Sequence, residues 1–193
     1  MSHAHAARSG GPMPMAHPGR IIYVQTIFDT ETILKNYGKS TTCSSPTWLP
    51  HPGSGQSLMY MITNWANQIS GQGTGNLELQ AKPNDIVNWR SMSLSSNTGD
   101  AAVIYAIQTD TPGVIGIPTL MQTRPTVPIL KPPGGCPASY TTEQITDSYW
   151  YSIIAKPGST TYKVFFFILT EDSSGKPVQY FYAWDPKITV VEV

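Results

Sequence analysis

Charged side chains are scarce in this sequence. Asp, Glu, Lys and Arg make up 12% of the 193 residues, and the 12 basic side chains balance the 12 acidic ones, so the formal net charge at pH 7 is zero. Globular proteins carry about a quarter charged residues. A protein that binds nucleic acid by neutralising phosphates needs a net basic surface, so this class is excluded. The same scarcity leaves little electrostatic repulsion between copies of the chain.

Long hydrophobic runs are also absent. No stretch of about 18 consecutive apolar residues occurs, which excludes a membrane-spanning helix. Residues 1–19 are rich in Gly, Pro, Ala and His and hold no apolar core of the length that a signal peptide needs. We therefore expect a cytoplasmic protein whose first 19 residues form a disordered tail.

Only two cysteines are present, Cys43 and Cys136, which lie 93 positions apart. A disulfide between them would close a long loop and stabilise the fold. In a reducing cytosol two free thiols are favoured, so reduced cysteines are the prediction. Neither a Cys-x-x-Cys nor a His-x-x-x-His spacing occurs, and no metal or other cofactor is predicted.

Histidine is nearly confined to the tail, where His3, His5 and His17 lie; His51 lies among prolines in a predicted loop. The histidines and methionines of a floppy tail would hold a soft metal only weakly. A Ser–His–Asp arrangement needs a histidine on a rigid frame, and no Gly-x-Ser-x-Gly surrounds any serine. The acidic residues form no evident dyad. We therefore do not expect an enzyme.

Glycine and proline are abundant instead, with 16 and 17 residues. Short β-branched and aromatic segments alternate with turn signals every 8–12 residues, which is typical of a sandwich or barrel. Asp29 offers an N-cap oxygen to one short helix near residues 30–37. We predict an all-β protein, an antiparallel β-sandwich of jelly-roll or immunoglobulin-like type, formed as a single domain by residues 20–193. The predicted strands are 21–28, 58–62, 76–80, 87–90, 102–107, 149–155, 162–169, 179–184 and 188–193.

Several connections have recognisable turn chemistry. Residues 95–100 predict a hairpin loop into the strand at 102–107. Residues 156–159 fit a type II turn, after which the strand at 162–169 returns. The proline-rich stretch 110–138 predicts a long excursion with an edge strand at 127–130.

Two runs are apolar on both sides. Phe165–Leu169 and Tyr180–Trp184 must lie in the middle of a sheet or beneath another surface, because such runs promote aggregation when exposed.

The glycine cluster Gly71–Gly75 resembles a phosphate-binding loop only superficially. That chemistry needs a following helix, whereas the next residues alternate as a strand, so a flexible loop between strands is predicted.

Four aromatic side chains fall in or beside predicted loops: Trp48, Trp65, Tyr140 and Trp150. A flat ring in such a place can stack on a sugar or a partner. The competing interpretation, which we favour, is that large rings at strand ends cap the hydrophobic core. A glycan- or small-ligand-binding module that uses these four rings is the alternative function.

Four motifs in order resemble the bacterial inclusion body protein family, PixA/AidA. They are Asp29-Thr30-Glu31-Thr32-Ile33-Leu34, Ser70-Gly71-Gln72-Gly73-Thr74-Gly75-Asn76-Leu77, Asp85-Ile86-Val87-Asn88-Trp89-Arg90 and Tyr180-Phe181-Tyr182-Ala183-Trp184-Asp185-Pro186. The resemblance covers about Arg20 to Val193. It implies a cytoplasmic bacterial protein that accumulates in quantity, in some members as inclusions and in others under quorum-sensing control, and it implies no catalytic residue.

Composition and resemblance together predict a non-enzymatic β-sandwich that associates with itself. A surface that is poor in charge lowers the barrier to contact between copies, and sheet edges supply unpaired backbone groups. The predicted partner is therefore a second copy of the chain. A glycan or small molecule is the partner under the alternative function, and neither nucleic acid nor a membrane is expected.

Overall fold

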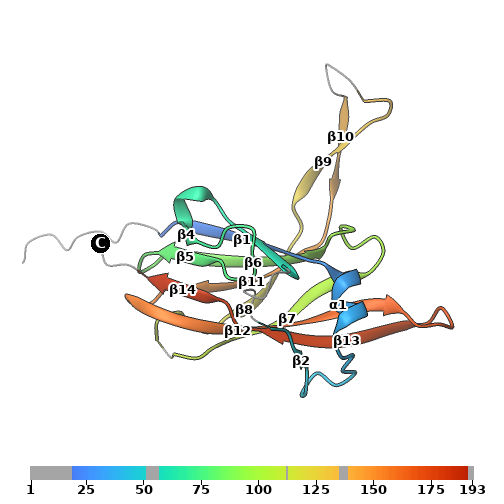
Figure 1. The fold of residues 1–193 in the computed structure, drawn as a ribbon. Helices are drawn as coiled ribbons and strands as arrows, with labels where there is room; N and C mark the ends of the chain where they lie inside the picture. Colours follow the sequence, from blue (N-terminus) through green and yellow to red (C-terminus); the bar gives the residue numbers. More distant parts are fainter. Residues whose placement is uncertain (1–18, 51–56, 112, 135–138, 191–193) are drawn as a thin grey trace, which may run out of the picture.

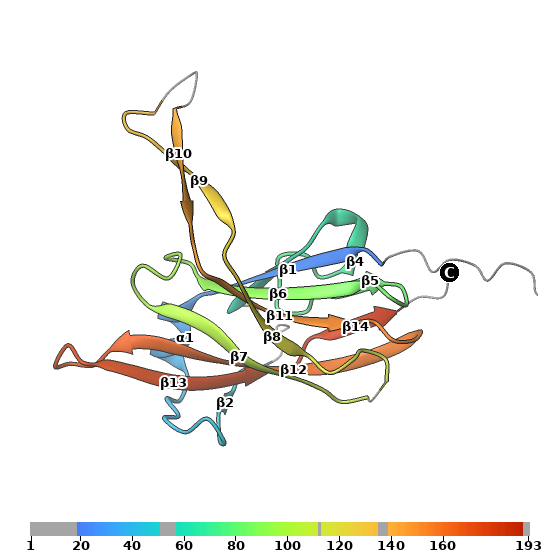
Figure 2. The same ribbon diagram turned by 180° about the vertical axis from the view of Figure 1, so that it is seen from behind.

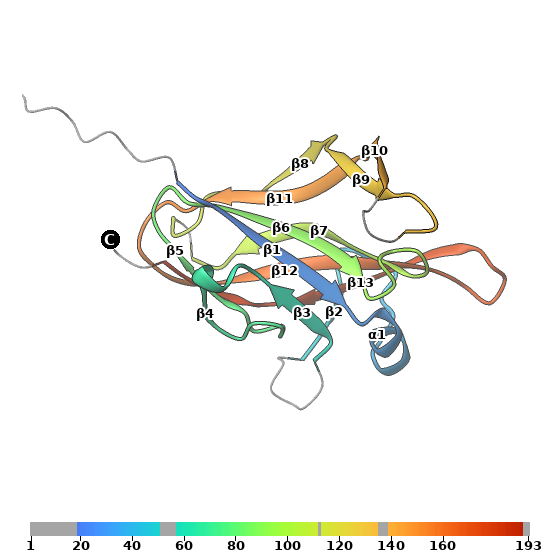
Figure 3. The same ribbon diagram turned by 90° about the horizontal axis from the view of Figure 1, so that it is seen from above.

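The computed structural model describes residues 19–50, 57–111, 113–134 and 139–190. Within these residues two β-sheets face each other across one hydrophobic core (Figure 1). A two-stranded arm projects away from both sheets, as the view from behind also shows (Figure 2), whereas the view from above looks along the arm (Figure 3).

The first sheet has five strands in the order β3-β1-β6-β11-β8. Its central strands are β1 and β6, which run parallel from the pair Ile21–Ile86 to the pair Phe28–Ser93. Along β1 the side chains of Ile22, Val24, Thr26 and Phe28 are buried, while the intervening ones face outward. The strands are β1 (Ile21–Phe28), β3 (Met59–Ile62), β6 (Ile86–Ser93), β8 (Thr119–Thr123) and β11 (Asp147–Ile153).

The second sheet has seven strands in the order β2-β13-β12-β14-β5-β4, with β7 paired to the other side of β12. The 14-residue strand β12 organises it, because β14, β13 and β7 all pair with it. The strands are β2 (Thr47–Trp48), β4 (Gln68–Ser70), β5 (Glu78–Ala81), β7 (Ala101–Thr109), β12 (Gly158–Glu171), β13 (Pro177–Trp184) and β14 (Lys187–Val190).

Two strands form the arm, β9 (Thr126–Leu130) and β10 (Tyr140–Gln144). They pair antiparallel with each other over five residues and with no other described strand. The chain enters the arm from β8 and leaves it into β11, so the first sheet anchors its base.

The helix predicted near residues 30–37 is α1 (Thr30–Asn36). Asp29 is its N-cap, as predicted, and accepts a hydrogen bond from the backbone N–H of Thr32 at 3.0 Å. A single 3-10 turn, η1 (Trp65–Asn67), precedes β4. No helix in the part of the chain that the structure describes is long and apolar enough to cross a membrane.

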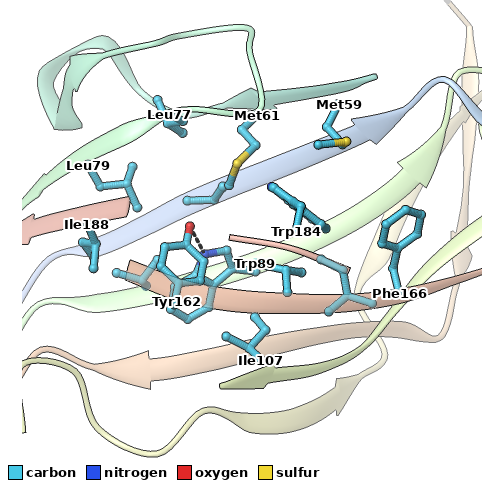
Figure 4. Close-up of a cluster of buried hydrophobic side chains, with 14 of the residues drawn as sticks. Met59, Met61, Leu77, Leu79, Trp89, Ile107, Tyr162, Phe166, Trp184 and Ile188 are labelled. Atoms are coloured by element: carbon cyan, nitrogen blue, oxygen red, sulfur yellow. Dashed lines mark hydrogen bonds between the residues drawn. The ribbon is translucent and has the colours of Figure 1, made fainter. Parts of the chain in front are cut away.

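The core lies between the two sheets (Figure 4). Trp89 from the first sheet donates its indole N–H to the hydroxyl of Tyr162 from the second, at 3.2 Å. Because Tyr162 is buried, its pKa is raised well above the ordinary value, the Trp89 hydrogen bond opposing the shift only in part. Buried aliphatic and aromatic side chains from both sheets fill the rest, including Met59, Met61, Leu77, Leu79, Phe166, Trp184 and Ile188.

The predicted fold class is confirmed, but the pairing is not wholly antiparallel. The sheets are mixed, because β1 with β6, β2 with β13 and β5 with β14 are parallel pairs. Parallel partners need long crossover connections, and the alternation of side chains along a strand carries no information on which partner it will find. The sequence pattern therefore does not predict whether two paired strands run parallel or antiparallel.

Two predicted hairpins are wrong, because the chain changes sheet at each. The loop after β6 leads to β7 in the second sheet, and the turn after β11 leads to β12 there. In the first loop the Asn97 side-chain oxygen accepts hydrogen bonds from the backbone N–H groups of Ser93 and Ala102, at 2.8 and 3.0 Å. Turn residues close a loop equally well when the chain crosses between layers.

Three further local predictions concern the strand at 127–130, the glycine cluster and the N-terminal tail. The strand expected at 127–130 exists as β9, and among the described strands it pairs with β10 alone. The glycine cluster precedes strand β5, as predicted, but its Gly73 N–H donates to the Met61 carbonyl at 2.9 Å, which ties the loop to β3. The predicted tail at residues 1–19 lies outside the described residues except for Gly19.

Candidate interaction surfaces

The outer side of the second sheet carries a cluster of aromatic side chains, which we call the aromatic face. It points away from the first sheet, on the side where β2 lies (Figure 1). Strand register places its members on the same side of neighbouring strands, since Phe167 lies opposite both Val103 and Phe181. The aromatic face consists of Trp48, Val103, Tyr105, Phe165, Phe167, Leu169 and Phe181.

The rings of the aromatic face pack against one another. The Tyr105 ring contacts three of them, with centroid distances of 6.1 Å to Phe165, 6.4 Å to Phe167 and 5.6 Å to Phe181. Trp48 meets Phe165 edge-on at 6.1 Å. A bulge in β7 opposite Phe165 and Phe166 brings Tyr105 over β12. The result is a continuous surface of packed rings.

The aromatic face is only partly covered. Trp48 is 49% exposed, and Val103 and Leu169 are each 37% exposed. The segment before β2 borders the face, because the Phe181 N–H donates to the Ser40 carbonyl at 2.8 Å and the Tyr105 hydroxyl donates to the Cys43 carbonyl at 3.1 Å. Burial, together with the neighbouring Cys43, raises the pKa of Tyr105, so its hydroxyl stays protonated at neutral pH.

No member of the aromatic face is charged. On β12 the outward side chain of Lys163 forms an ion pair with Asp110 at 2.8 Å, beyond the aromatic residues. An uncharged surface of packed rings offers apolar contact to another surface, and its seven residues include no nucleophile, base or metal ligand of the Cys, His, Asp, Glu, Ser or Lys type. This surface therefore supports binding to another surface through apolar contact.

The arm is a second unusual feature. All five residues of β10 are exposed, and four of the five residues of β9 are exposed as well. Leu130 is 60% exposed, Ile129 41% and Tyr140 63%, so the arm presents apolar side chains to solvent. Two-stranded ribbons are at best marginally stable in water unless they pack against further structure.

The outer side of the first sheet carries a contrasting, polar cluster. The Arg90 guanidinium donates two hydrogen bonds to Asp147, at 2.9 and 2.7 Å, and lies 4.4 Å from the Tyr149 ring centroid and 5.7 Å from that of Tyr23. Its charge is thus already paired. Beside it on β6, Asn88 is 6% exposed and its side-chain oxygen has no hydrogen-bond partner among the described residues.

The four loop aromatics that the sequence singled out lie on four different elements. Trp48 belongs to β2 and the aromatic face, and Trp65, in η1, is 79% exposed. Tyr140 begins β10 in the arm. Trp150, on β11, is half-buried against the core and donates its indole N–H to the Ile104 carbonyl at 3.0 Å. No ring contact joins any two of these four described residues.

The structure describes only one of the two cysteines. Cys43 is a free, exposed thiol, and Cys136 lies outside the described residues, as do all four histidines. Among the residues that are described, no three His, Cys, Asp or Glu side chains gather to hold a metal ion. A hollow of about 650 Å³ between the loop after β6 and the β12–β13 hairpin includes the acids Asp100 and Glu171 in its lining.

The aromatic face as a whole was not anticipated from sequence. The signal was present in the run Phe165–Leu169, which is apolar on both sides of a strand. Only the strand register shows that the outer half of that run joins Tyr105, Phe181 and Trp48. In the arm, the strand β9 was predicted, but β10 carried no comparable signal, since it reads Tyr-Thr-Thr-Glu-Gln without apolar alternation.

Known proteins resemble this chain in sequence and in fold. The family model of the inclusion body protein PixA matches residues 20–190. The crystal structure of an inclusion body protein of that family from Burkholderia cenocepacia J2315 matches with a TM-score of 0.74 and 20% identity, covering 93% of this chain and 100% of that one. At this identity the structural likeness concerns the fold alone. Among curated proteins no match is found.

Proposed function

The chain belongs to the PixA family of inclusion body proteins, and from that premise we propose that it is a non-enzymatic protein that self-associates and accumulates in the cytoplasm. The observation that carries the proposal is the aromatic face, a partly exposed and uncharged surface built of packed rings. Two copies that bring this surface together across a two-fold axis would remove it from water.

The expected strength follows from the area of the face. Seven such residues present on the order of 400 Å² of apolar surface, within the usual range for the largest patch on a monomer. Burying about 400 Å² on each of two copies is worth about 20 kcal/mol before costs. Association costs about 4–15 kcal/mol, and ordering the side chains adds to this. The surplus is small, so self-association depends on protein concentration.

The neutral charge of the chain supports the same proposal. With 12 positive and 12 negative side chains the net charge is zero at pH 7, and the isoelectric point is about 6.9. A protein near its isoelectric point has little long-range repulsion between copies. Association is therefore strongest near neutral pH and weakens as the pH moves away in either direction.

The test replaces Val103 with Lys and Leu169 with Glu in one chain. These side chains lie on neighbouring strands at the exposed side of the aromatic face, and the pair of substitutions leaves the net charge unchanged. Association would then bury two charges, so we expect the average mass at 10 mg/ml and pH 7 to fall well below that of the wild type. Light scattering after size-exclusion chromatography measures it.

The matched control makes the same kind of change on the outer side of the first sheet. Ile21→Glu with Ile153→Lys alters two side chains that are 46% and 50% exposed and also keeps the net charge at zero. This variant should associate as the wild type does. A wild type that remains monomeric up to 10 mg/ml, or a control that weakens association as much as the test variant, contradicts the proposal.

Accumulation in quantity, under quorum-sensing control in the form that the family resemblance implies, is part of the same proposal. Protein per cell, measured by quantitative immunoblot, should rise steeply between sparse and dense cultures. A level per cell that is independent of density contradicts this part alone.

A second candidate function is binding of a sugar or another flat small molecule at Trp65. An indole that is 79% exposed is available for stacking on a ligand. Titration with a panel of oligosaccharides should then change the tryptophan fluorescence of the wild type and leave that of Trp65→Ala unchanged. An unchanged fluorescence of the wild type across the panel rejects this function.

A further inference from the structure

Neither edge of the arm is paired within the part of the chain that the structure describes, and the pattern of hydrogen bonds in the hairpin decides which backbone groups face these free edges. The Lys131 N–H donates to the Ser139 carbonyl at 2.9 Å, and the Ile145 N–H donates to the Pro125 carbonyl at 3.1 Å. In an antiparallel pair, hydrogen-bonded and non-hydrogen-bonded residue pairs alternate. The pair Leu130–Tyr140 is therefore not hydrogen-bonded, whereas the next pair, Ile129–Thr141, is. The pair Pro128–Thr142 is again not hydrogen-bonded, and this alternation continues along the arm.

It follows that Tyr140, Thr142 and Gln144 direct their backbone N–H and C=O groups away from β9, toward the free edge of β10. By the same alternation Leu130, Pro128 and Thr126 face the free edge of β9. Proline has no N–H, so the central donor of the β9 edge is missing. The β10 edge keeps all three donors and all three acceptors.

The β10 edge is also complementary to itself. When two copies of β10 pair antiparallel about a two-fold axis through Thr142, that residue lies opposite Thr142 of the second copy, and Tyr140 lies opposite Gln144. These are the outward-facing residues, so their N–H and C=O groups meet as hydrogen-bonded pairs. Glu143 then lies opposite Thr141, and no like charges are directly opposed.

We propose that the arm is a second self-association contact, in which the β10 edges of two copies join their hairpins into one four-stranded sheet. Four strands satisfy the need of an isolated two-stranded ribbon for further pairing. The occupant is a second copy, because the edge fits itself in register and the partner strand carries the same groups in the same order.

The size of the contact sets its role. A five-residue strand is about 17 Å long, and pairing along that length buries much less than the roughly 800 Å² per partner of a standard interface. The contact is therefore weak and forms only where the protein is concentrated. In this respect the inference rests on the proposed function, because the proposed accumulation of the protein supplies the high concentration.

Two different two-fold contacts on one molecule have a geometric consequence. A single two-fold interface closes at the dimer, whereas a chain that pairs through the aromatic face and also through β10 forms larger species, which are closed if the two axes intersect at a suitable angle and open otherwise. The arm thus extends assembly beyond the dimer, as an inclusion requires.

The test substitutes Thr142 by Pro. The change removes the central free-edge donor of β10 and leaves the internal ladder of the hairpin intact, because the Thr142 nitrogen faces away from β9. The matched control is Thr126→Pro, which makes the same change on the β9 edge. By sedimentation velocity at 10 mg/ml, we expect Thr142→Pro to stop at the dimer, while the wild type and Thr126→Pro form larger species.

Combination with the aromatic-face variant separates the two proposals. Val103→Lys with Leu169→Glu should stop at dimers joined by the arm, and the triple variant that adds Thr142→Pro should be monomeric. If Thr142→Pro assembles like the wild type while the face variant does not, the arm inference fails and the proposed function stands. A monomeric wild type overturns both.

Hydrogen exchange gives a second measurement that needs no variant. In the isolated chain the Thr142 N–H faces solvent, whereas the Thr141 N–H belongs to a bonded pair inside the hairpin. Raising the wild-type concentration from 0.1 to 10 mg/ml should slow exchange at Tyr140, Thr142 and Gln144 at least tenfold and change that at Thr141 much less. Equal exchange at both concentrations overturns the inference.

Discussion

The body of the sandwich and the arm are both made of paired strands, yet they hold their strands in place by different means. In the body, β12 has buried residues at alternate positions from Thr160 to Ile168, and its inner side chains meet those of the first sheet. In the arm, none of the ten strand residues is buried. Backbone pairing is common to both, so the difference lies in apolar burial.

The body and the arm therefore have different roles. A strand buried on one side resists substitution because cavities are costly there. A strand exposed on both sides tolerates substitution, and its backbone edge remains available to a partner. The body therefore determines the stability of the monomer, and the arm, like the aromatic face, determines how copies meet.

The largest expected effect comes from Phe166→Ala. Phe166 is fully buried, stacks on Phe28 at a centroid distance of 4.1 Å, and packs beside Tyr182 and Trp184 at 5.4 and 5.5 Å. Truncating a buried phenylalanine lowers the free energy of unfolding by about 3–5 kcal/mol. Urea unfolding followed by tryptophan fluorescence measures the loss.

The neighbouring residue provides the control. Phe167 has the same side chain on the same strand, but it is half-buried on the outer side of the sheet. Phe167→Ala should cost about 1.5 kcal/mol or less, since much of its area is already exposed in the monomer. Equal losses for the two variants would contradict the distinction between the inner and outer sides of β12.

An intermediate effect is expected at Asp85. Its side chain is 4% exposed, accepts hydrogen bonds from the Arg20 guanidinium at 2.8 Å and from the Lys82 backbone N–H at 2.9 Å, and forms an ion pair with Arg20. The Arg20 side chain is 46% exposed, which screens the pair. Asp85→Asn should therefore lower the free energy of unfolding by about 1–3 kcal/mol at pH 7.

The pH dependence at Asp85 has a definite sign. Burial raises the pKa of this carboxyl, but the hydrogen bonds and charge of Arg20 and the backbone N–H of Lys82 outweigh burial, and the net pKa is lowered. The stabilisation is thus complete above the unfolded pKa of about 3.9 and is lost as the pH falls through the lower folded value. The difference between wild type and variant in urea should narrow below pH 4.

A matched substitution in the arm tests whether loss of a carboxylate matters only in the body. Glu143→Gln also replaces a carboxylate by an amide, but at an exposed position of β10. It should leave the urea midpoint of the monomer unchanged at both pH 7 and pH 3. A loss as large as that of Asp85→Asn would mean that the arm contributes to the stability of the body.

Local features of the fold could be predicted from the sequence, whereas the choice of partner strands could not. Strand β1 and the Asp29 cap were predictable, because alternation and capping are local properties that neighbouring residues express. The two changes of sheet, after β6 and after β11, were not, since a turn has the same chemistry whichever layer follows. Partner choice is a long-range property of the packed sheets.

The candidate surfaces show the same division. The run Phe165–Leu169 was expected in the middle of a sheet, and β12 does lie between β7 and β13. That its outer half meets Trp48 from β2 depends on a parallel pairing between segments far apart in sequence. Of the arm, strand β9 was predicted and β10 was missed, because β10 has no apolar side that faces a core.

Among the truncations to alanine, the smallest expected effect is that of Leu130→Ala in the arm. Leu130 is 60% exposed and pairs with Tyr140 across the ribbon. Removing a side chain that is already mostly in water should lower the free energy of unfolding of the dilute monomer by about 0.5 kcal/mol or less. The same substitution at Leu77, which is fully buried, should cost about 2–5 kcal/mol. Urea unfolding at 0.05 mg/ml compares the two. A cost of about 2 kcal/mol or more at Leu130 would show that the arm packs within its own chain, which would leave no free β10 edge for a second copy.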